Sequence, residues 1–202
     1  MRIIRLLMVL YSLSLCLPLT AQETQYLKEL VIIAGKQKHK KMLGTGIKIP
    51  CAVASLTPDK TGYEIGSIIK TKHPFEIQEI SFRVSSNSIP GVVLGVEIYR
   101  IDSLFTKVLP APIIVEVPVC RRQRVNLTPK EQTIIEPGEY FVAVRFVDCD
   151  EKKEDGNIDS EKPKTLLFPL YIKDSFIRNS SNTALEKCKI NLGLKIKGIE
   201  YR

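Results

Sequence analysis

Tryptophan is missing from this chain of 202 residues, and histidine occurs only twice, as His39 and His73. Without tryptophan, stacking on the rings of a bound sugar would depend on tyrosine. Tyrosine in alternating strands more often packs within the sheet. Neither histidine has a visible partner for a catalytic triad. The sequence also lacks a Gly-x-Ser-x-Gly elbow, a His-Glu-x-x-His helix and a phosphate-binding glycine loop. We therefore assign no catalytic residue and no cofactor.

Metal-binding patterns are absent as well. The stretch from Asp148 to Glu161 is rich in carboxylates, which are the ligands that calcium prefers. If Gly156 is aligned on the glycine of an EF-hand loop, however, Lys153 and Lys162 fall at the third and twelfth positions, where oxygen ligands are required. We predict a solvated loop here and no metal site.

The first 21 residues have the pattern of a cleaved export signal. Met1–Arg5 is short and basic, Leu6–Leu17 is a continuous apolar run, and Ala21 precedes a plausible cleavage site at Gln22. The apolar run is too short to span a bilayer comfortably, and no second run follows it. We expect an exported protein, in the periplasm or on the cell surface, with no transmembrane segment after signal removal.

Export also sets the chemistry expected of the cysteines. Cys16 belongs to the signal, and the mature chain keeps Cys51, Cys120, Cys149 and Cys188. An oxidising compartment favours at least one disulfide among these four, with three pairings open. The alternative is that they are free and pack as small apolar residues. Their wide spacing does not match the close ligand pairs of zinc sites.

The charge balance is moderately basic. Loss of Arg2 and Arg5 with the signal lowers the formal net charge from +8 to +6. Such an excess serves solubility, and it is compatible with anionic polysaccharide, lipid headgroups or nucleic acid as partners. The one basic cluster, Lys36–Lys41, has no interleaved aromatic residues, which argues against a nucleic-acid platform. We interpret residues 22–50 as a lead-in strand and basic linker, and residues 51–202 as the domain.

Strand signals dominate from residue 27 onward, and helix is conceivable only near residues 183–189. The clearest alternation is Val92, Leu94, Val96 and Ile98 on one face of a strand. With about ten short strands and many turns, the sequence predicts an all-β fold: a single β-sandwich or jelly roll of about eight to ten strands.

Two local features are predicted within this pattern. The apolar parity changes between Phe75 and Val84, which predicts a bulge or bend at Gln78–Glu79. Residues 121–127 are predicted to form a hairpin with residues 113–119. In that hairpin Arg122, Arg124 and Asn126 would face water.

Two stretches resemble sequences of exported Bacteroidetes proteins. Residues 27–34 with 40–44 resemble the segment that follows a carboxypeptidase-like regulatory domain in outer-membrane proteins; this chain lacks that domain, so no receptor function is carried over. Residues 62–69, 74–82, 96–99 and 136–142, in that order, resemble jelly-roll domains of uncharacterised exported proteins, with a galactose-binding-like pattern. The second resemblance covers roughly residues 50–150 and implies fold more than function.

The leading functional hypothesis is an exported, non-catalytic β-sandwich that binds a glycan or a protein of the bacterial envelope. The alternatives are a hydrolase that acts on a surface polymer through an unrecognised carboxylate pair, and a purely structural envelope component. Nucleic acid is not expected as a partner.

Candidate binding residues follow from strand alternation. If residues 92–101 and 140–147 turn their apolar parity to the core, Glu97, Tyr99, Phe141 and Arg145 lie together on the opposite face. If exposed, this face would have the composition of an interaction hot spot; the alternative is that a loop or the second sheet covers it. Asp102-Ser103-Leu104 also resembles the O-glycosylation signal of exported Bacteroidetes proteins, which makes Ser103 a candidate modification site.

Overall fold

The computed structural model describes residues 35–44, 49–150, 164–180 and 183–202. The proposed signal, the strand expected at residues 27–34 and most of the acidic stretch lie outside these residues. Regular structure in the described chain is almost entirely β. The one helical turn is a 3-10 turn, η1 (Pro58–Lys60). Within the described residues no helix has the length and apolar character needed to cross a membrane.

Twelve strands make up the fold. They are β1 (Lys38–Gly44), β2 (Ala52–Leu56), β3 (Glu64–Thr71), β4 (Phe75–Asn87), β5 (Val92–Arg100), β6 (Ile113–Val117), β7 (Cys120–Leu127), β8 (Thr133–Ile135), β9 (Gly138–Asp148), β10 (Leu166–Arg178), β11 (Glu186–Asn191) and β12 (Lys195–Tyr201).

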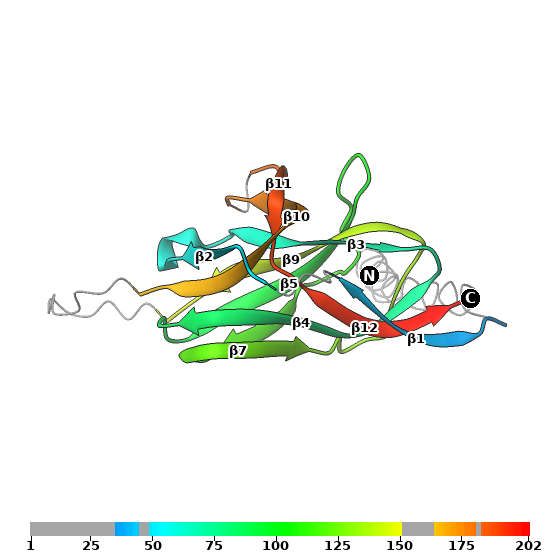
Figure 1. The fold of residues 1–202 in the computed structure, drawn as a ribbon, viewed down its shortest axis with the longest axis horizontal. Coiled ribbons are helices and arrows are strands. Elements are labelled where there is room, and N and C mark those ends of the chain that lie inside the picture. Colours follow the sequence, from blue (N-terminus) through cyan, green and yellow to red (C-terminus); the bar gives the residue numbers. More distant parts are fainter. Residues whose placement is uncertain (1–34, 45–48, 151–163, 181–182) are drawn as a thin grey trace, which may run out of the picture.

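The strands form two antiparallel sheets that share β10 (Figure 1). In sheet A, β1 pairs with β12, and β12 pairs with β4. β7 and β8 also pair with β4. The first half of β10 pairs with both β4 and β2. In sheet B the order is β11, the second half of β10, β3, β9, β5 and β6. The expected all-β sandwich is confirmed, with twelve strands where eight to ten were expected.

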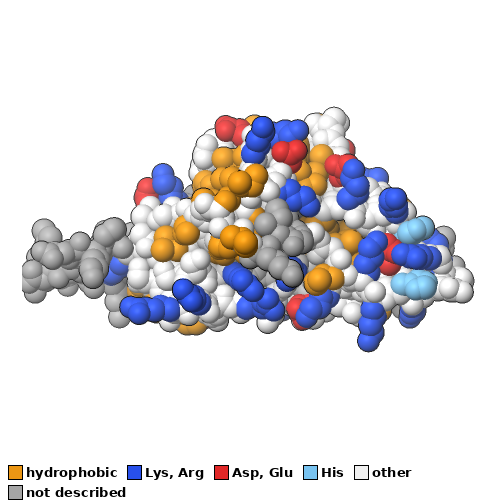
Figure 2. Space-filling model, in the orientation of Figure 1, with side chains coloured by type: hydrophobic (Ala, Val, Ile, Leu, Met, Phe, Trp, Pro, Cys, Tyr) orange, Lys and Arg blue, Asp and Glu red, His pale blue; other side chains and the backbone are white. Residues whose placement is uncertain are grey.

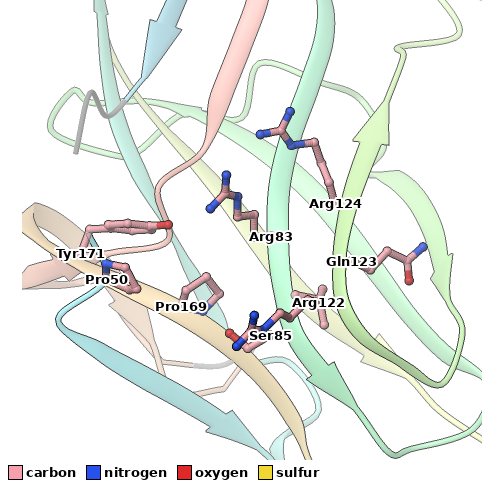
Figure 3. A pocket seen from close by; sticks show the side chains of 9 residues that line it. Pro50, Arg83, Ser85, Arg122, Gln123, Arg124, Pro169 and Tyr171 are labelled. Atoms are coloured by element: carbon pink, nitrogen blue, oxygen red, sulfur yellow. The ribbon is translucent and has the colours of Figure 1, made fainter. Parts of the chain in front are cut away.

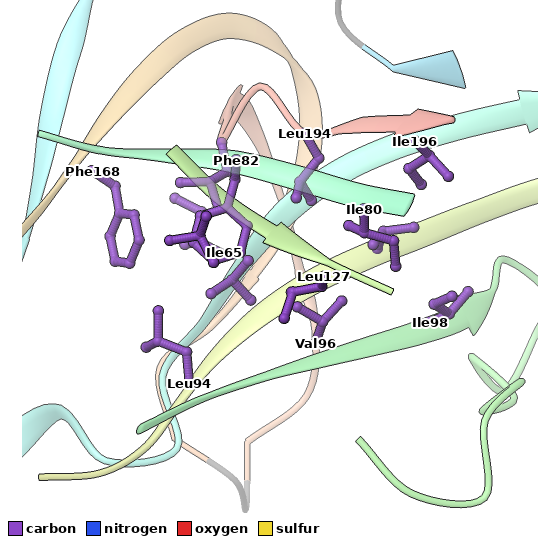
Figure 4. Packing of buried hydrophobic residues seen from close by; sticks show 14 of the residues in the cluster. Ile65, Ile80, Phe82, Leu94, Val96, Ile98, Leu127, Phe168, Leu194 and Ile196 are labelled. Atoms are coloured by element: carbon purple, nitrogen blue, oxygen red, sulfur yellow. The ribbon is translucent and has the colours of Figure 1, made fainter. Parts of the chain in front are cut away.

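The core lies between the two sheets and follows the predicted alternation. The four apolar residues on one face of β5, Val92, Leu94, Val96 and Ile98, are buried, as are Tyr140, Val142, Val144 and Phe146 of β9. Figure 4 shows Ile80 and Phe82 of β4 among the side chains that pack with Leu94, Val96 and Ile98 of β5. Burial of this apolar surface, at about 25 cal/mol per Å², is the main stabilising contribution to the fold.

The bulge predicted in β4 is present. Lys197 pairs with Glu79 and the next residue, Gly198, pairs with Ile77, so Gln78 is the extra residue of a β-bulge. Gly198 is required there, because a Cβ at this position would lie 1.9 Å from the carbonyl oxygen of Glu76. The change of apolar parity in the sequence therefore predicted the position of this bulge correctly.

Three local expectations are wrong. Residues 113–117 and 121–127 are not hairpin partners: β6 pairs with β5 in sheet B, whereas β7 pairs with β4 in sheet A, so the chain crosses between sheets at Pro118–Val119. The segment considered for a helix, residues 183–189, overlaps β11 and contains no helix. Part of the supposed basic linker is β1, an edge strand paired with β12 along its whole length.

Candidate functional site

The structure brings the four residues predicted from alternation together on the outer face of sheet B. The Tyr99 and Phe141 rings stack with centroids 6.0 Å apart. The Tyr99 hydroxyl lies 2.9 Å from Oε2 of Glu97, and Arg145 Nη1 donates to Oε1 of the same carboxylate at 3.2 Å. Alternation predicted that these side chains share one parity, and the pairing of β5 with β9 brings them together.

Three of the four residues are covered, however, and they do not form an exposed docking face; Arg145 keeps 30% of its side chain exposed. Tyr99 and Glu97 are 2% and 3% exposed, and Phe141 is fully buried. The loop after β5 covers them with Phe105, and the β10–β11 hairpin covers them with Phe176; these two rings meet edge to face at 4.9 Å. The outer face of sheet B thus carries a second, smaller core.

A second buried carboxylate, Glu64 of β3, completes what we call the Tyr99 cluster: Glu64, Glu97, Tyr99, Arg145 and Arg178. Both oxygens of Glu64 lie 3.2 Å from the Tyr99 hydroxyl, and Arg178 Nη1 donates to Oε1 at 3.3 Å. The hydroxyl has one proton, so it can serve only one of the two carboxylates at a time.

The pKa values of the two carboxylates of the cluster are shifted in opposite directions. Burial raises the pKa of Glu64; Arg178 partly offsets this, while Glu97 adds to it. Burial also acts on Glu97, but hydrogen bonds from Lys107, Tyr99 and Arg145 outweigh it and lower its pKa. Lys107, at 2.6 Å from Glu97, ties the covering loop to the sheet.

The Tyr99 cluster is a closed structural unit. The cavity beside Glu97 has a volume of only about 10 Å³, enough for no more than a single water molecule. A glycoside hydrolase needs room for a sugar and an attacking water between its carboxyl groups, and this pair offers none. Ser103 lies at the exposed tip of the covering loop, in a turn where Asp102 accepts hydrogen bonds from the Leu104 and Thr106 amides.

The expected disulfide is not borne out. Cys51, Cys120 and Cys188 are free thiols, and no disulfide joins the four mature cysteines within the described structure. The Cys51 and Cys188 thiols donate to the carbonyls of Leu170 and Ile190, while Cys120 and Cys149 pack against the main core. The two-sheet core is large enough to need no cross-link.

A groove on the other side of the molecule has the features of a binding site. Its volume is about 580 Å³, within the usual range of ligand sites. We call it the arginine groove. Its lining includes Arg83 and Ser85 of β4, Arg122 and Arg124 of β7, and Pro50, Pro169 and Tyr171. In Figure 3, Tyr171, Pro50 and Pro169 lie across from the arginines.

The groove exists because β10 leaves sheet A. On one edge of β4, β12 pairs as far as Ser81 and β10 begins at Ser86. Residues 82–85 therefore face the gap that opens where β10 turns toward sheet B. Tyr171 is held at the wall by Gly193 (φ +68°), because a Cβ there would lie 2.3 Å from the tyrosine ring.

The groove concentrates uncompensated positive charge. Arg83 and Arg124 are direct cross-strand partners, an arrangement that costs stability because like charges face each other. No acidic residue lines the groove, and within the described residues Arg83, Arg122 and Arg124 form no ion pair. Arg122 has φ +53°, in the left-handed region that disfavours side chains with a Cβ. Residues in such conformations are enriched at binding and active sites.

The sequence signalled only part of this site. Arg122 and Arg124 were predicted to face water, and both are exposed. Arg83 was not singled out, because only the pairing of β4 with β7 places it beside Arg124. Tyr171 was considered only as one of several tyrosines that could stack on a sugar. In Figure 2, Lys and Arg side chains gather in the lower part of the view, over β4, β7 and β12, with few acidic side chains among them.

Comparison with known proteins does not identify a family. No family model and no curated protein matches the chain. One similar solved structure is a T13 particle of infectious bursal disease virus, with TM-score 0.37 and 9% identity, covering 83% of this chain and 40% of that chain. Another, T=1 particles of a mutant VP2 protein of the same virus, has TM-score 0.34 and 10% identity, covering 82% of this chain. The chain spans about 40% of the length of these proteins.

Proposed function

We propose that this chain is an exported, non-catalytic binding module of the bacterial envelope, and that the arginine groove takes an anionic glycan. The carrying observation is the groove itself: three arginines without acidic partners on one wall and Tyr171 with two prolines on the other. The export pattern of the first 21 residues and the resemblance to exported Bacteroidetes proteins support the location.

The chemistry of the groove favours a carboxylate or sulfate ligand. A guanidinium presents paired N–H donors that match the two oxygens of such a group, and it stays charged at every physiological pH. An anion between Arg83 and Arg124 would relieve their mutual repulsion, so binding is favoured by more than the new contacts alone. An acidic segment of an envelope protein would use the same charges but would gain less from so small a groove.

The hydrolase alternative draws no support from the Tyr99 cluster. Glu64 and Glu97 share one tyrosine hydroxyl, but both are buried and paired with Arg178, Arg145 and Lys107. A catalytic pair must reach the substrate, and these carboxylates cannot do so while the covering loop and hairpin stay in place.

The test is a triple variant, Arg83→Gln, Arg122→Gln and Arg124→Gln, measured for binding to polygalacturonate and to dextran sulfate by titration calorimetry. Three exposed ion pairs together are worth roughly 1–3 kcal/mol, so we expect affinity to fall by about 5- to 150-fold. Neutral dextran should not bind to either form.

A matched control separates the groove from net charge. Lys60, Lys173 and Lys187 are exposed and lie outside the groove, and their change to Gln removes the same charge. The control should keep wild-type affinity apart from a small long-range loss. Equal losses in the two triple variants would contradict the proposal, because binding would then depend on net charge alone.

A further inference from the structure

Basic residues continue beyond the arginine groove along the outer face of sheet A. Lys195 of β12 lies opposite Ser81, two residues along β4 from Arg83 and on the same face. Met42 of β1 lies opposite Lys197, which is two residues from Lys195 and on the same face. Lys40 and Lys38 precede Met42 by two and four residues, so they share this face as well. We call Lys38, Lys40 and Lys195 the lysine strip.

The strip carries unpaired charge, as the groove does. Lys197 lies between its members but is paired with Glu79 at 2.8 Å. Within the described residues Lys38, Lys40 and Lys195 take part in no ion pair; the Lys38 ammonium lies over the ring of Tyr201, at 5.9 Å from the centroid. At about 3.3 Å per residue along the strands, groove and strip together extend over roughly 30 Å.

We propose that the ligand is a linear acidic polysaccharide, which enters the arginine groove and continues along the lysine strip. This inference rests on the proposed function, since it takes the groove as the binding site. A monosaccharide or an inorganic anion would fill the groove alone. Charges spaced along one face match a polymer that carries a negative charge on successive units.

The same face argues against the other extended ligands. Single-stranded nucleic acid is held by bases stacked on aromatic side chains. Neutral sugar chains likewise stack on aromatic rings. The tyrosines along this face, Tyr171 and Tyr201, are only 5% and 1% exposed, so they offer no stacking surface. Recognition along this face therefore depends on charge pairing, which favours an acidic polymer that has no nucleobases to stack.

Oligogalacturonates of increasing length test the inference. For the wild-type mature protein we expect affinity to rise by about tenfold (about 1.4 kcal/mol) from the trimer to the dodecamer at fixed salt. In the variant Lys38→Gln, Lys40→Gln and Lys195→Gln, the trimer should bind as in wild type, while the gain with length should be lost. The dependence of affinity on salt should also become weaker, because fewer counterions are released.

The outcomes distinguish this inference from the proposed function. If the trimer and the dodecamer bind equally tightly to wild type, the strip is not used, although the groove still binds anions. If the groove variant binds all oligomers as wild type does, the proposed function fails. Tighter binding of an oligothymidylate of equal charge would identify nucleic acid as the ligand and overturn the choice of polysaccharide. The variant Lys60→Gln, Lys173→Gln and Lys187→Gln again controls for net charge.

Discussion

Arg122 shows at the scale of one residue how stability and binding can conflict. Its φ of +53° places an arginine in a backbone region that glycine adopts freely and other residues avoid. The cost of such a conformation is about 1–3 kcal/mol, and the side chain faces the groove. Glycine at this position would avoid the cost, whereas the arginine adds a positive charge to the groove.

Replacing Arg122 should therefore stabilise the protein while weakening binding. For Arg122→Gly we expect the free energy of unfolding to rise by about 0.5–1.5 kcal/mol, because relief of strain exceeds the entropy cost of glycine. Urea denaturation measures this change, and calorimetry with polygalacturonate measures the accompanying loss of affinity. Arg124→Gly is the matched control. Among non-glycine residues only Phe105 and Arg122 have positive φ in the described chain, so glycine at position 124 relieves no strain and should destabilise.

The wall residue Gly193 gives a second prediction at this scale. In Gly193→Ala the new methyl group would overlap the Tyr171 ring, at a backbone φ of +68° that alanine disfavours. We expect a loss of roughly 1–3 kcal/mol in the free energy of unfolding and a displaced Tyr171. Near-ultraviolet circular dichroism reports the tyrosine environment. Gly35, also at positive φ (+73°) but with nothing near its missing Cβ, is the control, and Gly35→Ala should leave that spectrum unchanged.

At the scale of one element, β1 tests whether the basic lead-in is part of the domain. Leu43 turns into the core and is 7% exposed, whereas its neighbour Met42 is 59% exposed on the opposite face. Leu43→Ala should lower the free energy of unfolding by about 2–3 kcal/mol through lost burial, and Met42→Ala should change it by less than about 0.5 kcal/mol. Equal effects of the two substitutions would mean that β1 is not docked on β12 in solution.

The same element shows where sequence patterns reach their limit. The alternation of β5 and β9 predicted their faces, and the change of parity in β4 predicted its bulge, because both features depend on residues close in sequence. The strand β1 was not predicted, because its sequence is mostly basic and contains a single buried leucine, Leu43. The choice of strand partners was beyond local pattern: β6 and β7 are adjacent in sequence, but each pairs with a different sheet.

For the candidate sites, too, the features that depend on residues close in sequence were predicted, and those that depend on distant strand pairing were not. Alternation placed Glu97, Tyr99, Phe141 and Arg145 on one face, but their cover comes from a loop and a hairpin that pattern could not place. The arginine groove depends on where β10 leaves sheet A, which is a property of the complete topology. Only the outward direction of Arg122 and Arg124 was visible beforehand.

At the scale of the whole molecule, the outer face of sheet B pairs its charged side chains, whereas the arginine groove and the lysine strip on sheet A leave theirs unpaired. On sheet B the carboxylates of Glu64 and Glu97 are buried among Arg145, Arg178 and Lys107, and each cation has an acidic partner. On sheet A the groove and the lysine strip leave their charges in water. The first arrangement holds loop and hairpin to the sheet, and the second is available to a ligand. The buried carboxylates of sheet B should therefore contribute to the pH dependence of stability, as should Glu200 of β12, whose pKa is lowered chiefly by the hydrogen bond from Lys41.

The signs of this dependence differ for the two glutamates of sheet B. The pKa of Glu97 is lowered by its hydrogen bonds despite burial, so its contribution is present above the ordinary carboxyl pKa of about 4.3 and is lost as pH falls through the lower value. The pKa of Glu64 is raised, chiefly by burial. Its ionisation therefore costs stability as pH rises above about 4.3, through the raised value, and folding is favoured below it.

Two isosteric variants separate these contributions in urea denaturation across the acid range. Glu97→Gln should lower the free energy of unfolding at neutral pH by about 1.5–3 kcal/mol, because Lys107 and Arg145 lose a charged partner, and this deficit should shrink toward low pH as the wild-type carboxylate is protonated. Glu64→Gln imitates the protonated side chain, so its stability relative to wild type should increase as pH rises above about 4.3. The same pH profile in both variants would contradict this assignment, because it would mean that the Tyr99 hydroxyl and its neighbouring cations do not distinguish the two carboxylates.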